Sequence, residues 1–458
     1  MPMEPAEVKA YIRKRAKEGR TSFGLSFQGI EVLPPDVVEL QTIESLELTG
    51  NPITTLPPEL ARLPNLKTLF LDGTNLSEWP EVLSHMPQLE RLVLTGCGLL
   101  EVPPSIKELQ DLKYLFLYGN QLRELPIELS HLSSLELLML DMNPLGELPD
   151  WLGRLQTLDR FTARECGLTK WPSVVESFSA LSHLDLSQNE IGELPSTFVS
   201  LSDLKELWLT HAKLQCLPEE IGELPLLRRL ALTDNAIQEL PDSMGQLQNL
   251  DTLWMENNRL SRLPPSFSKL SSLTYLDLSN NQFQHFPSEI LPLSELEVLD
   301  FSSNQLELLP DDIGSLSQLR KLRLSYNPLA SLPESLGELT KLADVCLYQA
   351  QLVELPDSFR RLEKLEGIDL TGNQLDAFPQ QLCELALLVH LNLRGNQIDS
   401  IPSEIAQLQR LEMLAVEDNN ISSLPKEMSE LKVLHFFRVD GNPLPEGAVE
   451  RLGLDLWR

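Results

Sequence analysis

Two aspartates in this chain could do acid–base chemistry together. Asp277 and Asp300 stand 23 residues apart in matching phrases, "YLDLSNN" and "VLDFSSN". A pair of close carboxylates is a common general acid–base arrangement. Arg323 holds the same place another 23 residues on and could neutralise Asp300. We therefore expect a non-enzymatic protein without catalytic residues, and an enzyme that uses this pair is the least favoured alternative.

Histidines and cysteines give no sign of a metal or cofactor site. The sequence has seven histidines and five scattered cysteines. None of them falls into a C-x-x-C or H-E-x-x-H spacing, and no phosphate-binding glycine loop or G-x-S-x-G motif is present. We expect no metal and no cofactor. Cysteines without a pairing pattern also favour a reducing compartment, so we expect a cytoplasmic protein.

Charge and hydropathy exclude two further classes of partner. The chain carries 67 acidic against 37 basic residues, a formal net charge of −30. So acidic a protein is poorly suited to nucleic acid or to an anionic membrane surface. No apolar run reaches the roughly 20 residues that cross a bilayer, and the hydrophilic start of the chain does not resemble a secretory signal.

The elements that position these residues follow from a repeat. From Pro34 to Pro425, 18 prolines recur every 23 residues without a slip. The unit reads L-x-x-L-x-L-x-x-N-x-L-x-x-L-P, as in "LKYLFLYGNQLRELP". The L-x-L segment predicts a short strand with leucines on one side, and Leu-Pro predicts an extended return path. A lone strand cannot bury its leucines, so successive units must stack.

This phrase resembles the leucine-rich repeat family, in particular its 23-residue Leu-Pro subclass. It is similar to Ras-group repeat proteins such as the Sur-8-like scaffold and to stand-alone bacterial members. The resemblance implies an α/β solenoid: a horseshoe of about 19 coils, with a concave parallel sheet, a convex side of 3-10 or extended segments, and terminal helical caps. We predict an N-terminal capping helix over residues 1–20, repeats over residues 21–444 and a C-terminal cap over residues 445–458.

The asparagine of the phrase is replaced in five coils. The inward amide should satisfy backbone groups where each strand ends. Cysteine and threonine offer a weaker polar contact, whereas alanine offers none. We therefore expect the coils at Ala212 and Ala350 to be distorted or less stable, through tolerated drift or as a hinge. The replacements are Thr74, Cys97, Cys166, Ala212 and Ala350.

Variable strand positions face solvent on the concave side and should carry the function. In the early coils these positions are apolar and aromatic, which predicts an interaction surface. Packing of this surface against the protein's own terminus or a second copy is the alternative. The early residues are Phe70, Val93, Tyr114, Phe116, Tyr118, Leu137, Met139 and Met142.

The middle coils mix basic and aromatic residues at the same positions. Trp208 and Trp254 occupy the same strand position two coils apart, with Ala231 at that position between them, so a partner side chain could insert between the two rings. Two isolated surface tryptophans are an equally favoured interpretation. Basic spots among acidic neighbours suit a partner with acidic and apolar features; these spots are Arg91, Arg160, Arg164 and Arg229. The residues expected to contact the partner here are Arg160, Arg164, Trp208, His211, Arg229, Trp254 and Tyr275.

These observations predict a monomeric scaffold that binds a protein partner on its concave face. The resemblance implies intracellular signalling, with a small GTPase or another signalling protein as the partner. A bacterial effector that is delivered into host cells and binds a host protein is the alternative.

Overall fold

The computed structural model describes residues 3–454 and 456, and the chain divides into two compact units, Met1–Glu220 and Ile221–Arg458. The first unit contains α1 (Pro5–Ala16), β1 (Ser22–Gly24), β2 (Ser45–Glu47), β3 (Thr68–Phe70), β4 (Arg91–Val93), β5 (Tyr114–Phe116), β6 (Leu137–Met139), β7 (Arg160–Thr162), β8 (His183–Asp185) and β9 (Glu206–Trp208). The second contains β10 (Arg229–Ala231), β11 (Thr252–Trp254), β12 (Tyr275–Asp277), β13 (Val298–Asp300), β14 (Lys321–Arg323), β15 (Asp344–Cys346), β16 (Gly367–Asp369), β17 (His390–Asn392), β18 (Met413–Ala415) and β19 (Phe436–Arg438).

A short 3-10 helix follows each repeat proline. Proline fixes its own φ near −65° and favours an extended residue before it, so the chain turns only after Leu-Pro. These helices are η1 (Pro35–Glu39), η2 (Pro58–Arg62), η3 (Glu81–His85), η4 (Pro104–Glu108), η5 (Ile127–His131), η6 (Asp150–Arg154), η7 (Ser173–Ser177), η8 (Ser196–Ser200), η9 (Glu219–Glu223), η10 (Asp242–Gln246), η11 (Pro265–Lys269), η12 (Ser288–Ile290), η13 (Ile313–Ser315), η14 (Glu334–Glu338), η15 (Asp357–Arg361), η16 (Gln380–Glu384), η17 (Ser403–Gln407) and η18 (Lys426–Glu430).

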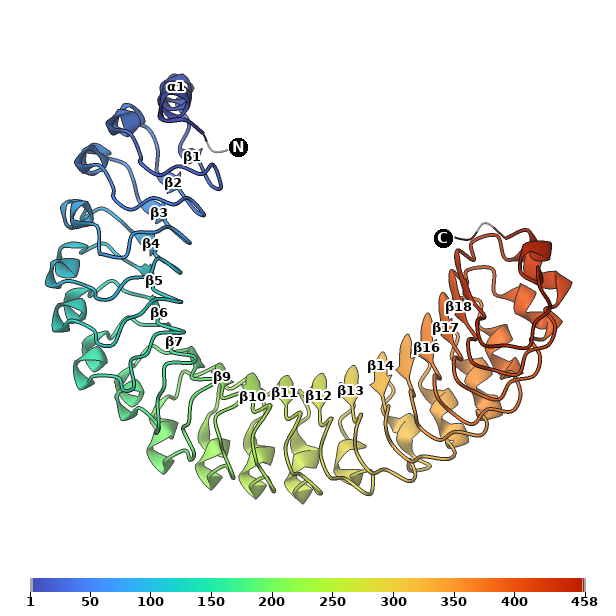
Figure 1. Ribbon diagram of the computed structural model, residues 1–458. Coiled ribbons are helices and arrows are strands. Elements are labelled where there is room, and N and C mark those ends of the chain that lie inside the picture. The colour runs from blue at the N-terminus through green and yellow to red at the C-terminus, as the bar shows by residue number, and fades with distance from the viewer. Residues whose placement is uncertain (1–2, 455, 457–458) are drawn as a thin grey trace. The chain divides into compact units, whose positions relative to one another are not determined.

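Within each unit the strands pair in parallel and in sequence order. Neighbouring strands are offset by one repeat, as in Thr68↔Arg91 and Phe70↔Val93. Figure 1 shows that in each unit, taken by itself, the strands line the inner side of a bend and the 3-10 helices line the outer side. The predicted solenoid class, with a concave parallel sheet and short 3-10 segments opposite it, is confirmed.

The strand period separates core from surface as the repeat predicts. Leu69 and Leu71 are fully buried, whereas Phe70 between them is half-exposed. The tryptophans that replace the leucine of Leu-Pro, Trp79 and Trp171, are also buried. Each unit therefore has a continuous leucine core between its strands and its 3-10 helices.

The inward asparagine amide bonds to the backbone of two coils. Asn120 donates from Nδ2 to the carbonyls of Leu94 and Leu117, both at 2.8 Å. Its Oδ1 accepts from the N–H groups of Cys97 at 3.1 Å and Leu99 at 3.0 Å. The predicted role of the asparagine is confirmed: one buried side chain satisfies four backbone groups where two neighbouring strands end.

Where cysteine or alanine replaces the asparagine, a backbone hydrogen bond between coils reverses, whereas the coil at Thr74 keeps the regular bond, from Asn75 N–H to Ile53 O at 2.9 Å. In a regular coil the residue after the asparagine donates back, as Gln121 N–H does to Leu99 O at 2.9 Å. At Ala350 the previous coil donates forward instead, from Leu329 N–H to Ala350 O at 3.1 Å. At Ala212 the donor is one residue further along, Gly192 N–H to Ala212 O at 3.0 Å, and Gly146 N–H bonds to Cys166 O at 2.9 Å from the same position. The coils at both alanines therefore depart from the regular repeat, and the coils at Cys97 and Cys166 do so as well.

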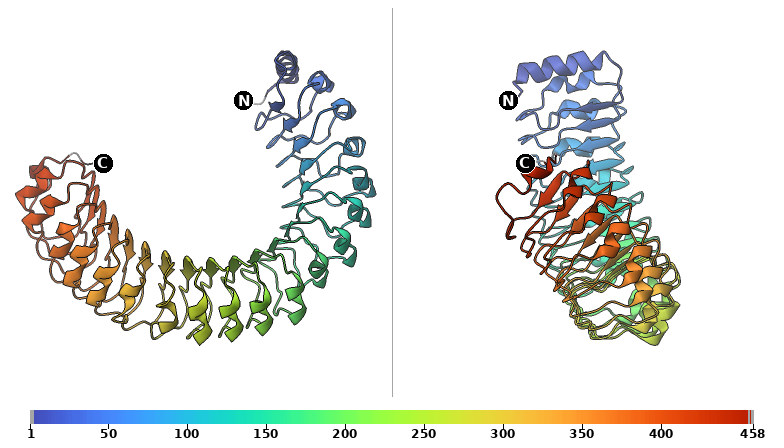
Figure 2. Two further views of the ribbon diagram at one scale, coloured as in Figure 1. Left: turned by 180° about the vertical axis from the view of Figure 1, so that it is seen from behind. Right: turned by 90° about the vertical axis from the view of Figure 1, so that its right-hand side faces the viewer.

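Helix α1 covers the first coil of the repeats at the amino end of the first unit (Figure 2). Val8 and Ile12 are the buried residues of this helix, and Gly19 ends the segment with φ +63°. Arg13 bonds to Asp36 at 2.8 Å, which ties the helix to η1. This agrees with a capping helix, although the predicted boundaries at residues 20, 21, 444 and 445 stay predictions.

At the other end, the segment after the last strand forms one further turn of 3-10 helix, η19 (Glu450–Leu452). Leu452 is buried at the end of that turn. Residues 455, 457 and 458 of the expected cap lie outside the described residues. No helix in the described part of the chain is long and apolar enough to cross a membrane.

Candidate protein-interaction surface

The early apolar residues come together on the concave side of the first unit. We call the set carried by β3 to β6 and the residues just after these strands the β3–β6 patch. Direct register places Phe70, Val93, Phe116 and Met139 in one row across four strands. The patch consists of Phe70, Val93, Tyr114, Phe116, Tyr118, Leu137, Met139 and Met142.

Members of the patch differ in how much surface they offer. Tyr118 is 40% exposed and Met142 is 42% exposed, whereas Phe70 and Phe116 are half-exposed. Val93 is only 7% exposed, because the larger rings of Phe70 and Phe116 flank it in the same row. Val93 therefore contributes to the floor of the patch rather than to its accessible surface.

Arg91 lies beside this patch and was not among the predicted contact residues. Its guanidinium carbon is 4.4 Å from the centroid of the Tyr114 ring and 5.5 Å from that of Phe116. Tyr114 is itself held, because its hydroxyl donates to Glu136 Oε2 at 2.9 Å. This hydrogen bond is also the main reason why the pKa of Tyr114 is raised. The sequence predicted Arg91 as a basic spot of this face, and its direct pairing with Tyr114 places it beside the patch.

The position just after each strand end has a left-handed backbone. In the first unit it is glycine beside the patch, at Gly73, Gly96 and Gly119, with φ between +61° and +68°. Glycine adopts this conformation without steric cost, and its missing side chain leaves the patch open on that side. Met142 occupies the same position in the next coil with φ +52°. Phe27 and Tyr326 are bulky exposed residues at the same position of other coils, so Met142 is one of several strained residues after strand ends.

The predicted basic residues of the middle coils lie beside carboxylates. Arg160 Nε is 3.6 Å from Asp159, and Arg164 Nε is 3.7 Å from Asp185. Both arginines remain exposed. The expectation that they stand out as basic spots is weakened, because the acids next to them offset much of their charge.

Asp141 is a second carboxylate below Arg164. It is 3% exposed, and it accepts hydrogen bonds from the Arg164 N–H at 2.7 Å and from the Thr162 hydroxyl at 2.8 Å. Burial raises its pKa. Its hydrogen bonds join two neighbouring coils, so its role in the first unit is structural.

The other predicted residues lie in separate units. Trp208 is half-buried, 6.4 Å from the His183 ring, and His211 is exposed in the first unit. In the second unit the Trp254 and Tyr275 rings are 5.7 Å apart, and Arg229 is exposed. The predicted grip between Trp208 and Trp254 combines residues of both units and stays a prediction.

Asp277 and Asp300 are adjacent in the second unit, as their spacing predicts. Asp277 Oδ1 accepts hydrogen bonds from the Ser279 N–H at 2.9 Å and the Ser279 hydroxyl at 2.6 Å. Asp300 Oδ1 accepts from the Ser302 N–H at 2.9 Å, and its Oδ2 is 3.5 Å from Arg323. Each aspartate thus closes the turn after its own strand, and Arg323 lies beside the pair as expected.

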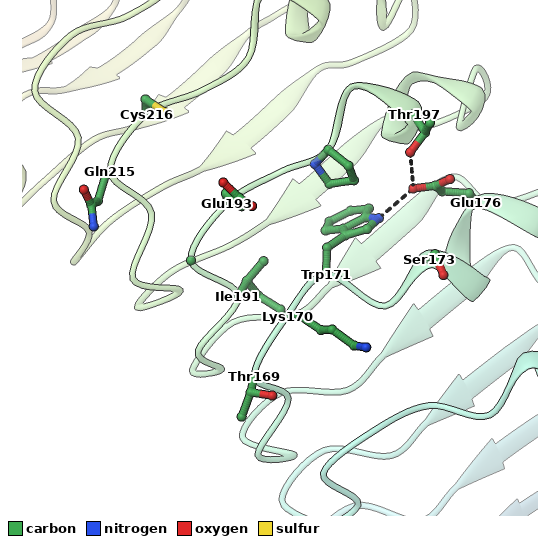
Figure 3. Close-up of a pocket in the computed structure, with 12 residues that line it drawn as sticks. Thr169, Lys170, Trp171, Ser173, Glu176, Ile191, Glu193, Thr197, Gln215 and Cys216 are labelled. Atoms are coloured by element: carbon green, nitrogen blue, oxygen red, sulfur yellow. Dashed lines mark hydrogen bonds between the residues drawn. The ribbon is translucent and has the colours of Figure 1, made fainter.

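A hollow of about 700 Å³ opens on the flank of the first unit, a feature that sequence reasoning missed. Its floor is Trp171, whose Nε1–H donates to Glu176 Oε1 at 2.9 Å; the Thr197 hydroxyl donates to the same oxygen at 2.9 Å (Figure 3). It borders the coils of Cys166 and Ala212, so the missing asparagines were the available signal. Among the described residues no group of three or more His, Cys, Asp or Glu could hold a metal ion.

Family models for leucine-rich repeats match most of the chain. The model described as "Leucine-rich repeat region" matches residues 265–369 and 368–453. The model described as "Leucine rich repeat" matches residues 41–99, 87–145 and 225–283, and a further single-repeat model matches residues 180–201. No curated protein matches the sequence.

Solved structures of repeat proteins align along most of the chain. A leucine-rich repeat protein of Leptospira interrogans is 27% identical, with a TM-score of 0.62 and coverage of 97% of this chain and 98% of that chain. The Arabidopsis receptor kinase HAESA, solved in complex with the peptide hormone IDA and the co-receptor SERK1, is 25% identical, with a TM-score of 0.69 and coverage of 95% and 82%. The stacked coils, the asparagine ladder and these matches lead to one conclusion: the chain is a leucine-rich repeat protein.

Proposed function

We propose that this protein binds a protein partner on the concave side of its first unit, with the β3–β6 patch as the main docking surface. Leucine-rich repeat proteins generally mediate protein–protein interaction and are generally non-enzymatic binding scaffolds. The observation that supports the proposal is a row of large apolar side chains left outside the leucine core.

The core does not need these side chains. Leu115, between Tyr114 and Phe116, is fully buried and fills the core on the other side of the strand. The row that contains Phe116 holds aspartate at the equivalent places in the second unit, Asp277 and Asp300. The fold therefore tolerates a charged residue in this row, and a cluster of exposed apolar residues there suits a binding surface.

A rigid sheet is also a favourable place for recognition. Backbone that is already ordered loses little conformational freedom on binding, and aromatic anchors tend to supply most of the affinity. HAESA, to which this chain is similar, is solved with a peptide hormone and a co-receptor bound. This supports a binding role for the chain without naming its partner.

Comparative pull-downs test the proposal. Wild type, Phe116→Asp and Leu308→Asp would be used as baits, with Trp208→Ala as a further bait for the middle coils. Leu308 is 65% exposed in the second unit and is the matched control. We expect Phe116→Asp to lose the main partner and Leu308→Asp to keep it, while both proteins melt at the wild-type temperature. An identical partner list for wild type and a folded Phe116→Asp protein rejects the patch as the site.

The finer parts of the assignment stay predictions. The similarity to the 23-residue Leu-Pro subclass and to Sur-8-like scaffolds, a small GTPase as partner, the cytoplasmic location and the monomeric state all rest on the sequence. The effector alternative would gain support from a gene that lies beside a secretion system. Contacts at Arg160, Arg164, Trp208, His211, Arg229, Trp254 and Tyr275 stay proposals as well.

A further inference from the structure

We propose that the β3–β6 patch recognises a side-chain carboxylate, an Asp or Glu within an apolar segment of the partner, and that Arg91 binds it. The inference rests on the proposed function, because it assigns the chemistry of the partner at that same surface. It starts from the unusual environment of one arginine.

Arg91 is held in place by rings rather than by a counter-charge. Its guanidinium stacks on Tyr114, 4.4 Å from the ring centroid, and also approaches Phe116. Within the described residues no carboxylate lies within 4.0 Å of it, and no hydrogen-bond acceptor is bound to it. Stacking fixes the plane of the guanidinium and leaves N–H groups at its edge for another molecule.

Other arginines on the concave side behave differently. Five of them have a carboxylate oxygen within 4.0 Å, at separations between 3.1 and 3.9 Å. In a chain with 67 acidic residues such pairing is the common outcome. Arg91 departs from it where aromatic side chains lie against the charge. The paired arginines are Arg160, Arg164, Arg323, Arg394 and Arg438.

The two carboxylates nearest Arg91 along its own and the next two strands, Glu90 and Glu136, are already occupied. Glu90 is bonded to Lys67 at 2.9 Å and to Lys113 at 3.0 Å, and these contacts hold its pKa below the usual range. Glu136 accepts from the Tyr114 hydroxyl. Neither is in contact with Arg91, so the positive charge of Arg91 on the open side of the sheet is not neutralised from within the patch.

A partner carboxylate fits this arrangement chemically. Arginine presents parallel N–H groups that match the two oxygens of a carboxylate, and such charge-assisted pairs are roughly twice as strong as neutral hydrogen bonds. Apolar partner residues beside the carboxylate would cover Phe70, Phe116 and Met139 and exclude water, which strengthens the pair. The open glycine positions at Gly96 and Gly119 leave room for the partner backbone next to these rings.

A different protein is a better occupant than a second copy of this chain. Two copies would bring together two molecules with a formal net charge of −30 each, and the repulsion between them opposes association. A segment with one acidic residue among apolar ones gives the same carboxylate without that repulsion. Nucleic acid is disfavoured for the same electrostatic reason.

The test uses peptides displayed as amino-terminal fusions, so that no free carboxyl terminus is available. Random twelve-residue peptides would be selected on the full chain and then counter-selected on Phe116→Asp. We expect the surviving peptides to be enriched in Asp or Glu beside large apolar residues. One such peptide, synthesised with an amidated carboxyl terminus, would be measured by fluorescence polarisation.

A double-mutant cycle separates direct binding from loss of the ring stack. Arg91→Ala and the Glu→Gln or Asp→Asn peptide should each weaken binding at least tenfold, and the two changes together should weaken it little more than either alone. Arg91→Glu should recover affinity for a peptide whose acid is replaced by Arg. Additive losses in the cycle overturn the inference, since they mean that Arg91 only supports the rings.

Failure of the inference can be told apart from failure of the proposed function. Peptides that depend on Phe116 but are indifferent to Arg91→Ala contradict the carboxylate assignment alone. A selection that returns only peptides indifferent to Phe116→Asp contradicts the docking surface itself. Light scattering that finds a dimer of wild type and a monomer of Arg91→Ala would assign the carboxylate to a second copy and overturn the choice of partner.

Discussion

Strands β3–β6 of the first unit and β12–β13 of the second use one repeat to present different concave surfaces. In the first unit the row through β3 to β6 is Phe70, Val93, Phe116 and Met139, and the left-handed position beside it is mostly glycine. In the second unit the same row contains Asp277 and Asp300, each bonded to the turn that follows its strand.

The left-handed positions beside these two groups of strands differ in the same way. In the second unit Asn280 Nδ2 donates to Asn257 Oδ1 at 2.9 Å, so polar side chains bond to one another along the strand ends. Asparagine tolerates a left-handed backbone better than most residues. Beside the patch, glycine leaves the same strip bare. The fold needs only a residue that accepts the left-handed conformation. The side chain at this position can therefore be a polar one that bonds to its neighbours, or it can be absent, as in glycine.

The largest effect that tests this comparison comes from neighbouring residues on β5. Leu115→Asp places a charge in the fully buried core and should cost at least about 4 kcal/mol of unfolding free energy. Phe116→Asp gives β5 the residue type that this row already carries at Asp185, Asp277 and Asp300, and should cost less than about 1 kcal/mol. Urea denaturation of both variants measures the difference. Similar losses from the two changes would mean that Phe116 belongs to the core and that the contrast between the units is mistaken.

A smaller effect is expected from repair of the asparagine ladder in the second unit. Ala350 offers no side-chain hydrogen bond, and the altered coils hold Ala330 and Gln351 at φ +53° and +61°. Ala350→Asn would restore the bonds that Asn120 makes in the first unit and would release both residues from a strained conformation. We expect a gain of about 1 kcal/mol in unfolding free energy. A lower melting temperature would show that these coils cannot return to the regular path.

How much the sequence predicted depends on how strictly each feature follows the period. Core leucines, the inward amide of Asn120 and the exposed row of Phe116 all recur every 23 residues, so their orientation could be predicted without coordinates. The stacking of Arg91 on Tyr114 depends on the side-chain conformations of two neighbouring strands, which the period does not determine. The reversed hydrogen bond at Ala350 arises from a missing group, and the sequence indicates where it occurs but not which backbone path replaces it.

Met142 tests whether the first unit has a lower free energy of unfolding because of a residue that it uses for binding. Met142→Gly removes an exposed side chain from a left-handed position, so we expect a gain of about 0.5–1 kcal/mol in unfolding free energy. The same variant should bind the partner or a patch-specific peptide more weakly. Gln349→Gly, at the equivalent position of the second unit with φ +50°, is the matched control and should keep full binding. Equal binding by wild type and Met142→Gly would leave the strained residue without a role in recognition.

The smallest effect concerns the acidic row of the second unit and depends on pH. Burial raises the pKa of Asp277, and the charge of Asp300 adds to the shift. An unfolded chain has the ordinary aspartate pKa of about 3.9. The folded protein therefore binds this proton more tightly, and the free energy of unfolding falls as pH rises from about 3.9 through the raised pKa.

Asp277→Asn removes that dependence while its side-chain oxygen can still accept the hydrogen bonds from Ser279. We expect the variant to be more stable than wild type at pH 7 and the difference to vanish below about pH 3.9, where wild type is protonated in both states. Thermal melts across that range measure the difference. A difference that stays constant with pH would mean that the turn at Ser279, rather than repulsion within the acidic row, decides the effect. The carboxylates of Asp277 and Asp300 would then lie side by side in the second unit without lowering its free energy of unfolding.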